Sequence, residues 1–195
     1  MINLSYEYQN GHKDEPKKEY IGGIWYIAPH PNFMHYSVCR NLFRIFDRHL
    51  FGKTCQAFFD GMDVYLTKED HFVPDFMVVC DKDIIKEKGI FGAPDLVVEI
   101  LSARTSKRDK THKKNIYEKC GVKEYWLVDT KRKEIEVYWL ADGRFVLNNV
   151  YILYEDEDIA EMTKDELDFL TYEFKTSIFD DLVIDVREVF DNIDI

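Results

Sequence analysis

Ala93-Pro-Asp-Leu-Val-Val-Glu-Ile-Leu-Ser102 is the stretch that decides the fold of this chain. Its apolar run predicts a buried strand over Leu96–Leu101, and that strand carries one acid, Glu99. Phe72–Cys80 repeats the pattern, because it places Asp75 within a second apolar strand. A charge buried among apolar side chains is unfavourable unless an opposite charge meets it. The two acids therefore predict a shared site that holds a cation.

A helix is expected after the Glu99 strand, starting at Thr105 or Ser106 and ending just before Gly121, a residue typical of helix ends. Three of its side chains are four residues apart and so share one helix face: Asp109, Lys113 and Tyr117. Because the helix follows the strand directly, we expect its first half to pack over the end of that strand.

The other elements alternate between strands and one further helix. A hairpin is predicted over Lys17–Ala28 around Gly22-Gly23, and a helix over His35–Phe51. Further strands are predicted over Thr54–Asp60, Met62–Leu66, Val122–Asp129, Glu134–Leu140, Arg144–Leu147 and Val150–Tyr154. The pattern predicts one α/β (α+β) domain over residues 17–195 with a mixed sheet, an acidic segment over 155–195, and a loose arm over residues 1–16.

The composition suits a folded domain, since 46% of the 195 residues are hydrophobic. No apolar run is long enough to span a membrane, and the start of the chain lacks the basic and apolar regions of a signal peptide. We therefore expect a cytoplasmic protein with no membrane partner. The cysteines lie far apart, which argues against a zinc site or a disulfide framework, so free thiols are expected at Cys39, Cys55, Cys80 and Cys120.

The net charge of −11 looks unfavourable for a nucleic-acid partner, but the charge is unevenly distributed. From Glu155 onward the chain holds 15 acidic and 3 basic residues, so the part before Glu155 carries about +1. Arg104–Lys123 contains eight basic residues against two acidic ones. A focused basic patch of this kind, rather than the net charge, is what meets phosphates.

The two buried acids indicate metal-assisted hydrolysis of a phosphodiester bond. Carboxylate oxygens suit Mg²⁺ or Mn²⁺, and few protein ligands are needed because magnesium keeps most of its water. Asp75 and Glu99 are the predicted metal ligands, with the backbone carbonyl of Ile100 as a third. Lys113 would orient the attacking water or offset the charge that develops on the phosphate.

Simpler interpretations exist for several of these residues. Asp109 and Lys113 fit an ordinary helix ion pair, worth about 0.3–0.5 kcal/mol at the surface, and Tyr117 fits an aromatic at the core edge. Asp95 follows Pro94 at the entry to the strand, where a turn role is favoured over catalysis. Asp75 and Glu99 are harder to explain in this way, because apolar residues surround both.

The chain closely resembles the Uma-two family of bacterial restriction-endonuclease-like proteins, which belongs to the PD-(D/E)xK superfamily. The resemblance covers Glu19 to about Phe190 and is carried by Val-Pro-Asp75, by residues 93–102, by Asp109 with Lys113 and Tyr117, and by Gly-Val-Lys-Glu-Tyr-Trp-Leu-Val-Asp129. It implies a restriction-endonuclease-like core in which helices flank a mixed sheet.

The resemblance also assigns roles to individual residues. It implies metal ligation by Asp75 and Glu99, and it selects Lys113 because Leu101 occupies the position where the superfamily motif carries lysine. Glu19 resembles an additional acid of the family, although pairing with a hairpin lysine explains it equally well. His35 is a further candidate near the site, with helix capping or packing as the favoured alternative. Gly22 and Ala103 depart from the family pattern, where an acid and a proline are usual.

The favoured function is a Mg²⁺- or Mn²⁺-dependent endonuclease that acts on DNA as a homodimer. The candidates for contacting phosphates lie in the basic helix: Arg104, Lys107, Arg108, Lys110 and Lys114. The alternatives are a catalytically silent nucleic-acid-binding module and a homo-oligomeric interaction domain on the same fold. The sequence favours the enzyme, because a binding module has no need for buried acids.

Overall fold

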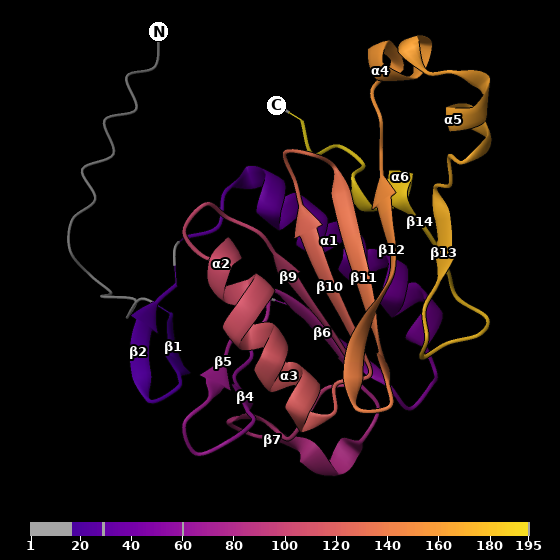
Figure 1. Cartoon of the computed structure of the whole chain (residues 1–195). Helices are drawn as coiled ribbons and strands as arrows, with labels where there is room; N and C mark the ends of the chain where they lie inside the picture. The colour runs from indigo at the N-terminus through magenta and orange to yellow at the C-terminus, as the bar shows by residue number, and fades with distance from the viewer. Residues whose placement is uncertain (1–16, 29, 60, 195) are drawn as a thin grey trace, which may run out of the picture.

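The computed structural model describes residues 17–28, 30–59 and 61–194. The predicted arm over residues 1–16 lies outside the described residues. Figure 1 shows a central sheet with helices on both faces and a smaller sheet beside it. The expected class, a mixed sheet flanked by helices, is confirmed.

The central sheet has six strands in the order β12-β11-β10-β9-β6-β3. Their bounds are β3 Gln56–Phe59, β6 Phe76–Val79, β9 Leu96–Ile100, β10 Glu124–Asp129, β11 Glu134–Ala141 and β12 Arg144–Ile152. β9 and β10 run parallel, whereas β6 pairs antiparallel with β9. The parallel pair brings the C-terminal ends of β9 and β10 to one edge of the sheet.

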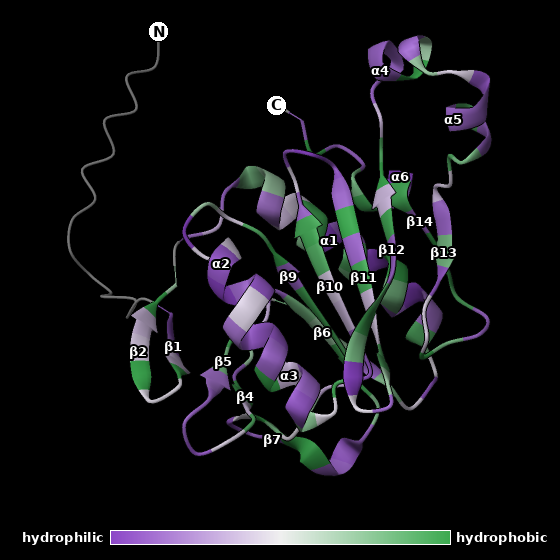
Figure 2. Ribbon diagram, viewed as in Figure 1, coloured by the Kyte–Doolittle hydropathy of each residue, from purple (hydrophilic) through white to green (hydrophobic). Residues whose placement is uncertain are grey.

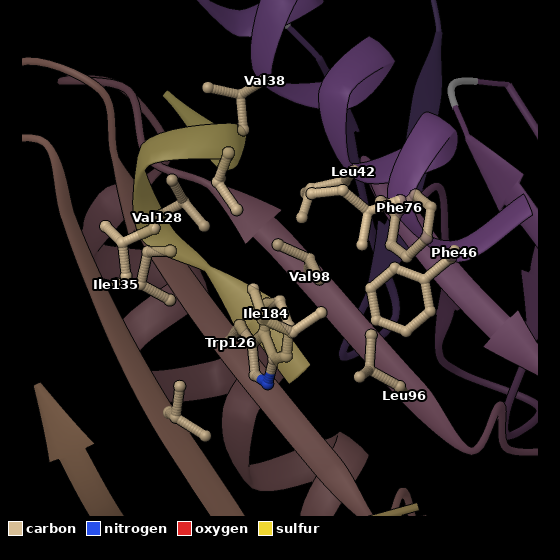
Figure 3. Close-up of a cluster of buried hydrophobic side chains, with 14 of the residues drawn as sticks. Val38, Leu42, Phe46, Phe76, Leu96, Val98, Trp126, Val128, Ile135 and Ile184 are labelled. Atoms are coloured by element: carbon tan, nitrogen blue, oxygen red, sulfur yellow. The ribbon is translucent and has the colours of Figure 1, made fainter. Parts of the chain in front are cut away.

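Side chains along β9 alternate between two hydrophobic clusters, one on each face of the sheet. Leu96 and Val98 face the first cluster with Val38, Leu42 and Phe46 from α1 (Phe33–Leu50), as Figure 3 shows. The helix begins at Phe33, two residues before the predicted start, and the side chain of Asn32 caps it by accepting a hydrogen bond from the backbone N–H of His35 at 2.9 Å.

The C-terminal part of the chain closes this first cluster. It contributes β13 (Glu173–Lys175), β14 (Val183–Asp185) and α6 (Val186–Val189). Phe174 of β13 stacks on Tyr151 with ring centroids 4.3 Å apart and lies edge-on to Trp126. Residues 173–189, although they belong to the segment predicted to be acidic, are therefore part of the core.

The opposite face is covered by the helix that the sequence predicts after β9. It consists of α2 (Ser106–Arg108), a π-helical turn η2 (Asp109–Lys113) and α3 (Lys114–Cys120). Gly121 ends it with a φ of +88°, the left-handed conformation that glycine adopts readily. In Figure 1 this helix crosses in front of the sheet and α1 lies behind it.

The second sheet also has six strands, in the order β2-β1-β5-β4-β8-β7. The strands are β1 Lys18–Ile21, β2 Ile24–Ile27, β4 Val64–Tyr65, β5 His71–Phe72, β7 Ile85–Lys86 and β8 Gly89–Phe91, with a short 3-10 turn at Lys82–Ile84 before β7. The hairpin predicted around Gly22-Gly23 is confirmed, with both glycines at positive φ. This sheet positions β1 beside the π-helical turn.

The first part of the acidic segment, residues 155–172, projects from the body of the molecule between β12 and β13, as Figure 1 shows. It contains α4 (Asp156–Glu161) and α5 (Lys164–Asp168), which are mostly hydrophilic in Figure 2. Thr163 caps α5 in a reciprocal arrangement with Glu166. This helix has only five residues.

The expectation of four free thiols is wrong. Cys55 and Cys80 form a disulfide, whereas Cys39 and Cys120 are free. The register of β3 and β6 pairs Gln56 with Val79, so the next residue on each strand brings the two cysteines opposite one another. Their separation of 25 residues gave no sign of this contact, which depends on the pairing of two strands.

Within the part of the chain that the structure describes, no helix combines the length and apolar character needed to cross a membrane.

Candidate active site

A cavity of about 560 Å³ opens at the C-terminal ends of β9 and β10. The N-terminal end of α1, strand β1 and the first half of the α2–α3 helix complete its wall. Both predicted metal ligands and the predicted lysine line this one cavity, with further ionisable groups beside them: Glu19, His35, Asp75, Glu99, Asp109 and Lys113. The predicted convergence of Asp75, Glu99 and Lys113 is therefore observed.

Asp75 and Glu99 face each other across two adjacent strands. The antiparallel register pairs Phe76 with Val98, so Asp75, one residue before β6 begins, lies opposite Glu99. Pro74 has no backbone N–H to donate to a sheet, which explains why β6 starts only after it. The carboxylate of Asp75 accepts a hydrogen bond from the backbone N–H of Ile100 at 2.7 Å.

Lys113 lies at the centre of the cluster. Its Nζ is 2.5 Å from Oε1 of Glu99, 2.9 Å from Oε1 of Glu19 and 3.7 Å from Oδ1 of Asp109. The lysine and these three acids are all buried. The contact with Asp109 is thus part of a buried network and differs from the exposed helix pair considered from the spacing alone.

Glu99 has a second donor from the same helix. The hydroxyl of Tyr117 donates to Oε1 of Glu99 at 2.8 Å, and the ring is fully buried against Phe72 and Tyr125. Tyr117 therefore both packs in the core and orients the carboxylate. Residues four apart align closely here because a π-helical turn has more residues per turn than an α-helix, and such turns often occur at functional sites.

Glu19 comes from the hairpin and joins the second sheet to this cluster. Its Oε1 also accepts a hydrogen bond from the backbone N–H of Val73 at 3.2 Å. His35 contacts Asp75 rather than the lysine, with Nε2 3.1 Å from Oδ1. Both residues predicted to stand near the site are thus in direct contact with its central groups.

Asp95, by contrast, lies outside the cluster, and its contacts are long-range ones rather than those of the turn role that the sequence favoured. Its carboxylate accepts from the backbone N–H of Cys80 at 2.7 Å and pairs with Lys123 at 2.7 Å. It does not line the cavity. The acid next to Pro94 therefore connects two strand ends and takes no part in the cluster.

The lysine is held in its charged form. Burial lowers the pKa of Lys113, but the attraction of Glu19, Glu99 and Asp109 outweighs burial and holds that pKa well above its ordinary value. A protonated ammonium donates hydrogen bonds and offsets negative charge. Lys113 is therefore unsuited to remove a proton from water.

For Glu99, in contrast to Lys113, burial outweighs the attraction of the opposite charge. Burial raises the pKa of Glu99 well above its ordinary value, and Lys113 only partly opposes that shift. Three nearby carboxylates add to the rise: Asp109, Asp75 and Glu19. The cluster thus holds more carboxylates than its buried lysine neutralises. A further cation or a proton is needed to balance the remaining negative charge.

Asp75 stays ionised because its partners outweigh its burial. Burial raises the pKa of Asp75, whereas the hydrogen bond and charge of His35, the charge of Lys113 and the backbone N–H of Ile100 lower it, and the result lies below the ordinary value. Of the two opposed acids, Asp75 is therefore the one whose surroundings favour the ionised carboxylate.

The donor chemistry of the cavity fits a hard divalent cation. Among the described residues, no three His, Cys, Asp or Glu side chains are grouped as a metal site made of side chains alone. Magnesium does not require such a group, because it keeps several waters and uses one or two carboxylates. The excess of carboxylates over buried cations supplies the electrostatic reason for a cation to bind there.

The basic helix is less available to phosphates than its sequence indicates. Lys110 pairs with Glu136 at 2.5 Å, Lys114 lies 3.3 Å from the ring centroid of Tyr138, and the guanidinium of Arg108 lies 4.5 Å from that of Tyr26. Lys110 also lines the cavity. Arg104 and Lys107 are exposed. The proposed phosphate contacts of these five residues stay predictions.

Two cavity-lining basic residues were missed by the reasoning from sequence. Lys131 and Arg132 lie in the turn after β10 and line the cavity. Their position directly after a buried strand could have indicated this location, because that strand runs parallel to the strand of Glu99. That signal requires the pairing of β9 and β10, which the sequence alone does not state.

Comparison with known proteins identifies the family of this chain. The model of the Uma2 (Uma-two) family, described as "Putative restriction endonuclease", matches residues 5–167. The chain belongs to the Uma2 family. Its matched region includes the strands of Asp75 and Glu99 and the helix of Lys113, so the whole cluster lies within the part that defines Uma2 proteins.

Two individual proteins match most of the chain. The uncharacterized protein slr1290 of Synechocystis sp. is 27% identical over 160 residues, which is 80% of this chain and 82% of that protein. A crystal structure from Anabaena variabilis, described as a putative nuclease belonging to DUF820, matches with a TM-score of 0.68 and 21% identity over 90% of each chain. The second match establishes that the two proteins share a fold.

Proposed function

We propose that this protein is a metal-dependent endonuclease that hydrolyses phosphodiester bonds of DNA. The observation that carries the proposal is the cluster in which Asp75 and Glu99 face each other while Lys113 contacts Glu99 within the same cavity. Membership of a family described as "Putative restriction endonuclease" supports the same reaction class. The description of the Anabaena variabilis protein as a "putative nuclease" is consistent with it.

Asp75 and Glu99 would hold Mg²⁺ or Mn²⁺, with the backbone carbonyl of Ile100 as an additional oxygen donor. When bound, such an ion lowers the pKa of water and neutralises charge on the phosphate. His35 and the N–H of Ile100 hold the Asp75 carboxylate from two sides, at 3.1 Å and 2.7 Å. Tyr117 holds Glu99 in the same way. These contacts restrict both carboxylates before a metal arrives.

Lys113 acts as a fixed positive charge in this proposal. Hydrolysis forms a bond from the water oxygen to phosphorus and breaks the bond to the leaving oxygen, which then takes up a proton. Negative charge grows on the phosphate oxygens during that exchange, and a buried ammonium stabilises it more strongly than one in water. Glu19 and Asp109 orient the ammonium by holding it from the other side.

A cleavage assay tests the proposal. Supercoiled plasmid, single-stranded DNA and RNA are incubated with the protein in Mg²⁺, in Mn²⁺ and in chelator. We expect cleavage of DNA only with a divalent ion, and we expect Glu99→Gln to abolish it while the fold persists. Glu157→Gln, an equal change on the exposed helix α4, is the matched control and should cleave normally. Cleavage that survives Glu99→Gln rules out the metal role of this residue.

A catalytically silent module is the competing function on the same fold. Calorimetric titration with Mn²⁺ separates the two, because the enzyme should bind the ion at the carboxylate cluster and lose that binding in Glu99→Gln. A wild-type protein that binds no Mn²⁺ and cleaves no nucleic acid would favour the silent module.

We also propose a homodimer, because one cavity reaches one strand of a duplex and two copies would reach both. Light scattering of the purified protein at micromolar concentration measures this directly. A mass equal to one chain under cleavage conditions would contradict the dimer without affecting the proposed chemistry.

A further inference from the structure

We propose that Lys131 and Arg132 bind the phosphate backbone of the nucleic-acid substrate beside the bond that is cleaved. The inference rests on the proposed function for the identity of the ligand, a polyanion of phosphodiesters. It assigns substrate binding to the turn after β10, in addition to the basic helix that the sequence singled out. Four observations support it.

The first observation is position. β9 and β10 are parallel neighbours, and the backbone N–H of Leu101 donates to the carbonyl of Val128 at 2.8 Å. The segment after β9 and the turn after β10 therefore leave the sheet side by side. Lys131 and Arg132 consequently line the same cavity as Glu99, the acid carried by β9.

The second observation is that the turn holds a defined shape. The carboxylate of Asp129 accepts hydrogen bonds from the backbone N–H groups of Lys131 and Arg132, at 2.9 Å and 3.1 Å. This is the side-chain-to-backbone arrangement that stabilises tight turns. It places two consecutive cations at the end of a buried strand without using their side chains.

The third observation is availability. The side chains of Lys131 and Arg132 are exposed, and neither forms an ion pair or a side-chain hydrogen bond within the described ranges. Lys133, the next residue, is different: it pairs with Glu155 at 2.7 Å and Asp194 at 2.9 Å. Lys133 is thus held by ion pairs within the protein, whereas Lys131 and Arg132 are available to a ligand.

The fourth observation is the charge of the cavity. Its floor carries the carboxylates of Glu19, Asp75, Glu99 and Asp109, which exceed the charge of Lys113. A nucleic-acid backbone approaching this floor meets repulsion, whose range is about 8–10 Å at physiological salt. Exposed cations at the rim offset that repulsion over the same range, so the cavity can admit a phosphate.

Salt-dependent binding tests the inference. Affinity for a fluorescent 20-base-pair DNA duplex is measured by anisotropy between 50 and 300 mM salt, with Ca²⁺ in place of Mg²⁺ to limit cutting. The slope of log K against log salt is negative, and each lost phosphate contact reduces its magnitude by about 0.9. Lys131→Gln/Arg132→Gln should therefore reduce the magnitude by about 1.8. We expect the affinity at 100 mM salt to fall roughly tenfold or more.

The matched control is Lys86→Gln/Lys88→Gln, which removes two exposed cations at β7, at the bottom of Figure 1 and away from the C-terminal ends of β9 and β10. Its slope should equal that of the wild type. An unchanged slope in the Lys131/Arg132 variant overturns the inference, and so does a wild type that does not bind DNA. Binding that depends on the two residues without any cleavage would support the inference and contradict the proposed nuclease.

Discussion

Lys113 shows how the function of one residue depends on its surroundings. The spacing of the helix predicted that Asp109, Lys113 and Tyr117 share a face. The structure adds Glu19 of β1 and Glu99 of β9, whose carboxylate oxygens lie within 3 Å of the Lys113 ammonium. An ammonium that meets three buried carboxylates is held charged, and this is the state that the proposed stabilisation of a phosphate requires.

The raised pKa of Glu99 predicts a pH dependence of stability in the absence of metal. In the unfolded chain the pKa of Glu99 is near its ordinary value of 4.5, whereas burial raises its pKa well above that in the folded protein. Between the two values the folded state binds more protons, so the contribution of Glu99 to stability is lost as pH rises. The loss reaches at most about 1.4 kcal/mol per pH unit. Glu99→Gln should therefore gain stability relative to the wild type between pH 5 and pH 8.

Urea unfolding in chelator at pH 5, 6.5 and 8 measures this difference. Glu157→Gln serves as the control, because its side chain is exposed. Parallel pH profiles for Glu99→Gln and the wild type would contradict the assignment of the shift to Glu99.

Glu124 is a buried acid outside the cavity, and its role is structural. It accepts from the indole N–H of Trp126 at 2.6 Å and from the backbone N–H and hydroxyl of Ser177 at 2.5 Å and 2.7 Å. Glu124→Ala leaves these donors without a partner, so we expect a loss of about 2–4 kcal/mol in the free energy of unfolding. Chemical denaturation checks this against Glu134→Ala on β11, which makes no side-chain hydrogen bond among the described residues.

At the scale of elements, β8 approaches β4 so closely that only glycine fits at the start of the strand. Gly89 has a φ of +139°, and a Cβ added there would lie 2.5 Å from the backbone carbonyl oxygen of Asp63. The same oxygen accepts the N–H of Ile90 at 2.8 Å, which fixes the distance between the strands. The smaller sheet, and through it β1 with Glu19, therefore depends on a residue without a side chain.

Two glycine substitutions separate the stability lost through a steric clash from the stability lost through an unfavourable backbone conformation. Gly143→Ala meets no atom within 4 Å and has a φ of +74°, so it should cost about 1 kcal/mol. Gly89→Ala adds a clash with backbone and should cost about 2–4 kcal/mol. Thermal unfolding of both variants measures the difference. Equal losses would mean that the contact between β8 and β4 relaxes easily.

At the scale of the whole molecule, the disulfide links the edge strand β3 to the strand that precedes the site. Cys55 and Cys80 close a loop of about 25 residues, and in the chain-entropy description such a link stabilises the fold by roughly 3 kcal/mol. Asp75 lies at the other end of β6, so the link supports the strand that presents a proposed metal ligand.

Thiol labelling tests the pairing. Protein that is unfolded without reductant and then alkylated should take up two labels, at Cys39 and Cys120. After reduction it should take up four and unfold at lower urea concentration. Four labels before reduction would show that Cys55 and Cys80 are not linked in the purified protein.

Much of this architecture followed from local patterns. Three elements depend on neighbours within a few residues, so each was predicted: strand β11, the glycine hairpin and the glycine stop after α3. Glu99 was identifiable because an acid inside an apolar strand has no inexpensive local explanation. The Cys55–Cys80 disulfide was not predicted. Nor were the contacts that the basic side chains of the helix make with residues on β11, Lys110 with Glu136 and Lys114 with Tyr138.

The sequence by itself determined which residues are acidic, basic or apolar and in what period they recur, and so it specified the strands, the helices and the chemical identity of the candidate site. Only the tertiary structure decided which charges meet. The contact of Glu19 with Lys113 spans 94 residues, and the partners of the basic helix lie on other strands. The physical reason is that electrostatic and hydrogen-bond energies depend on distance in space, which strand pairing sets, whereas a local pattern reports only separation along the chain.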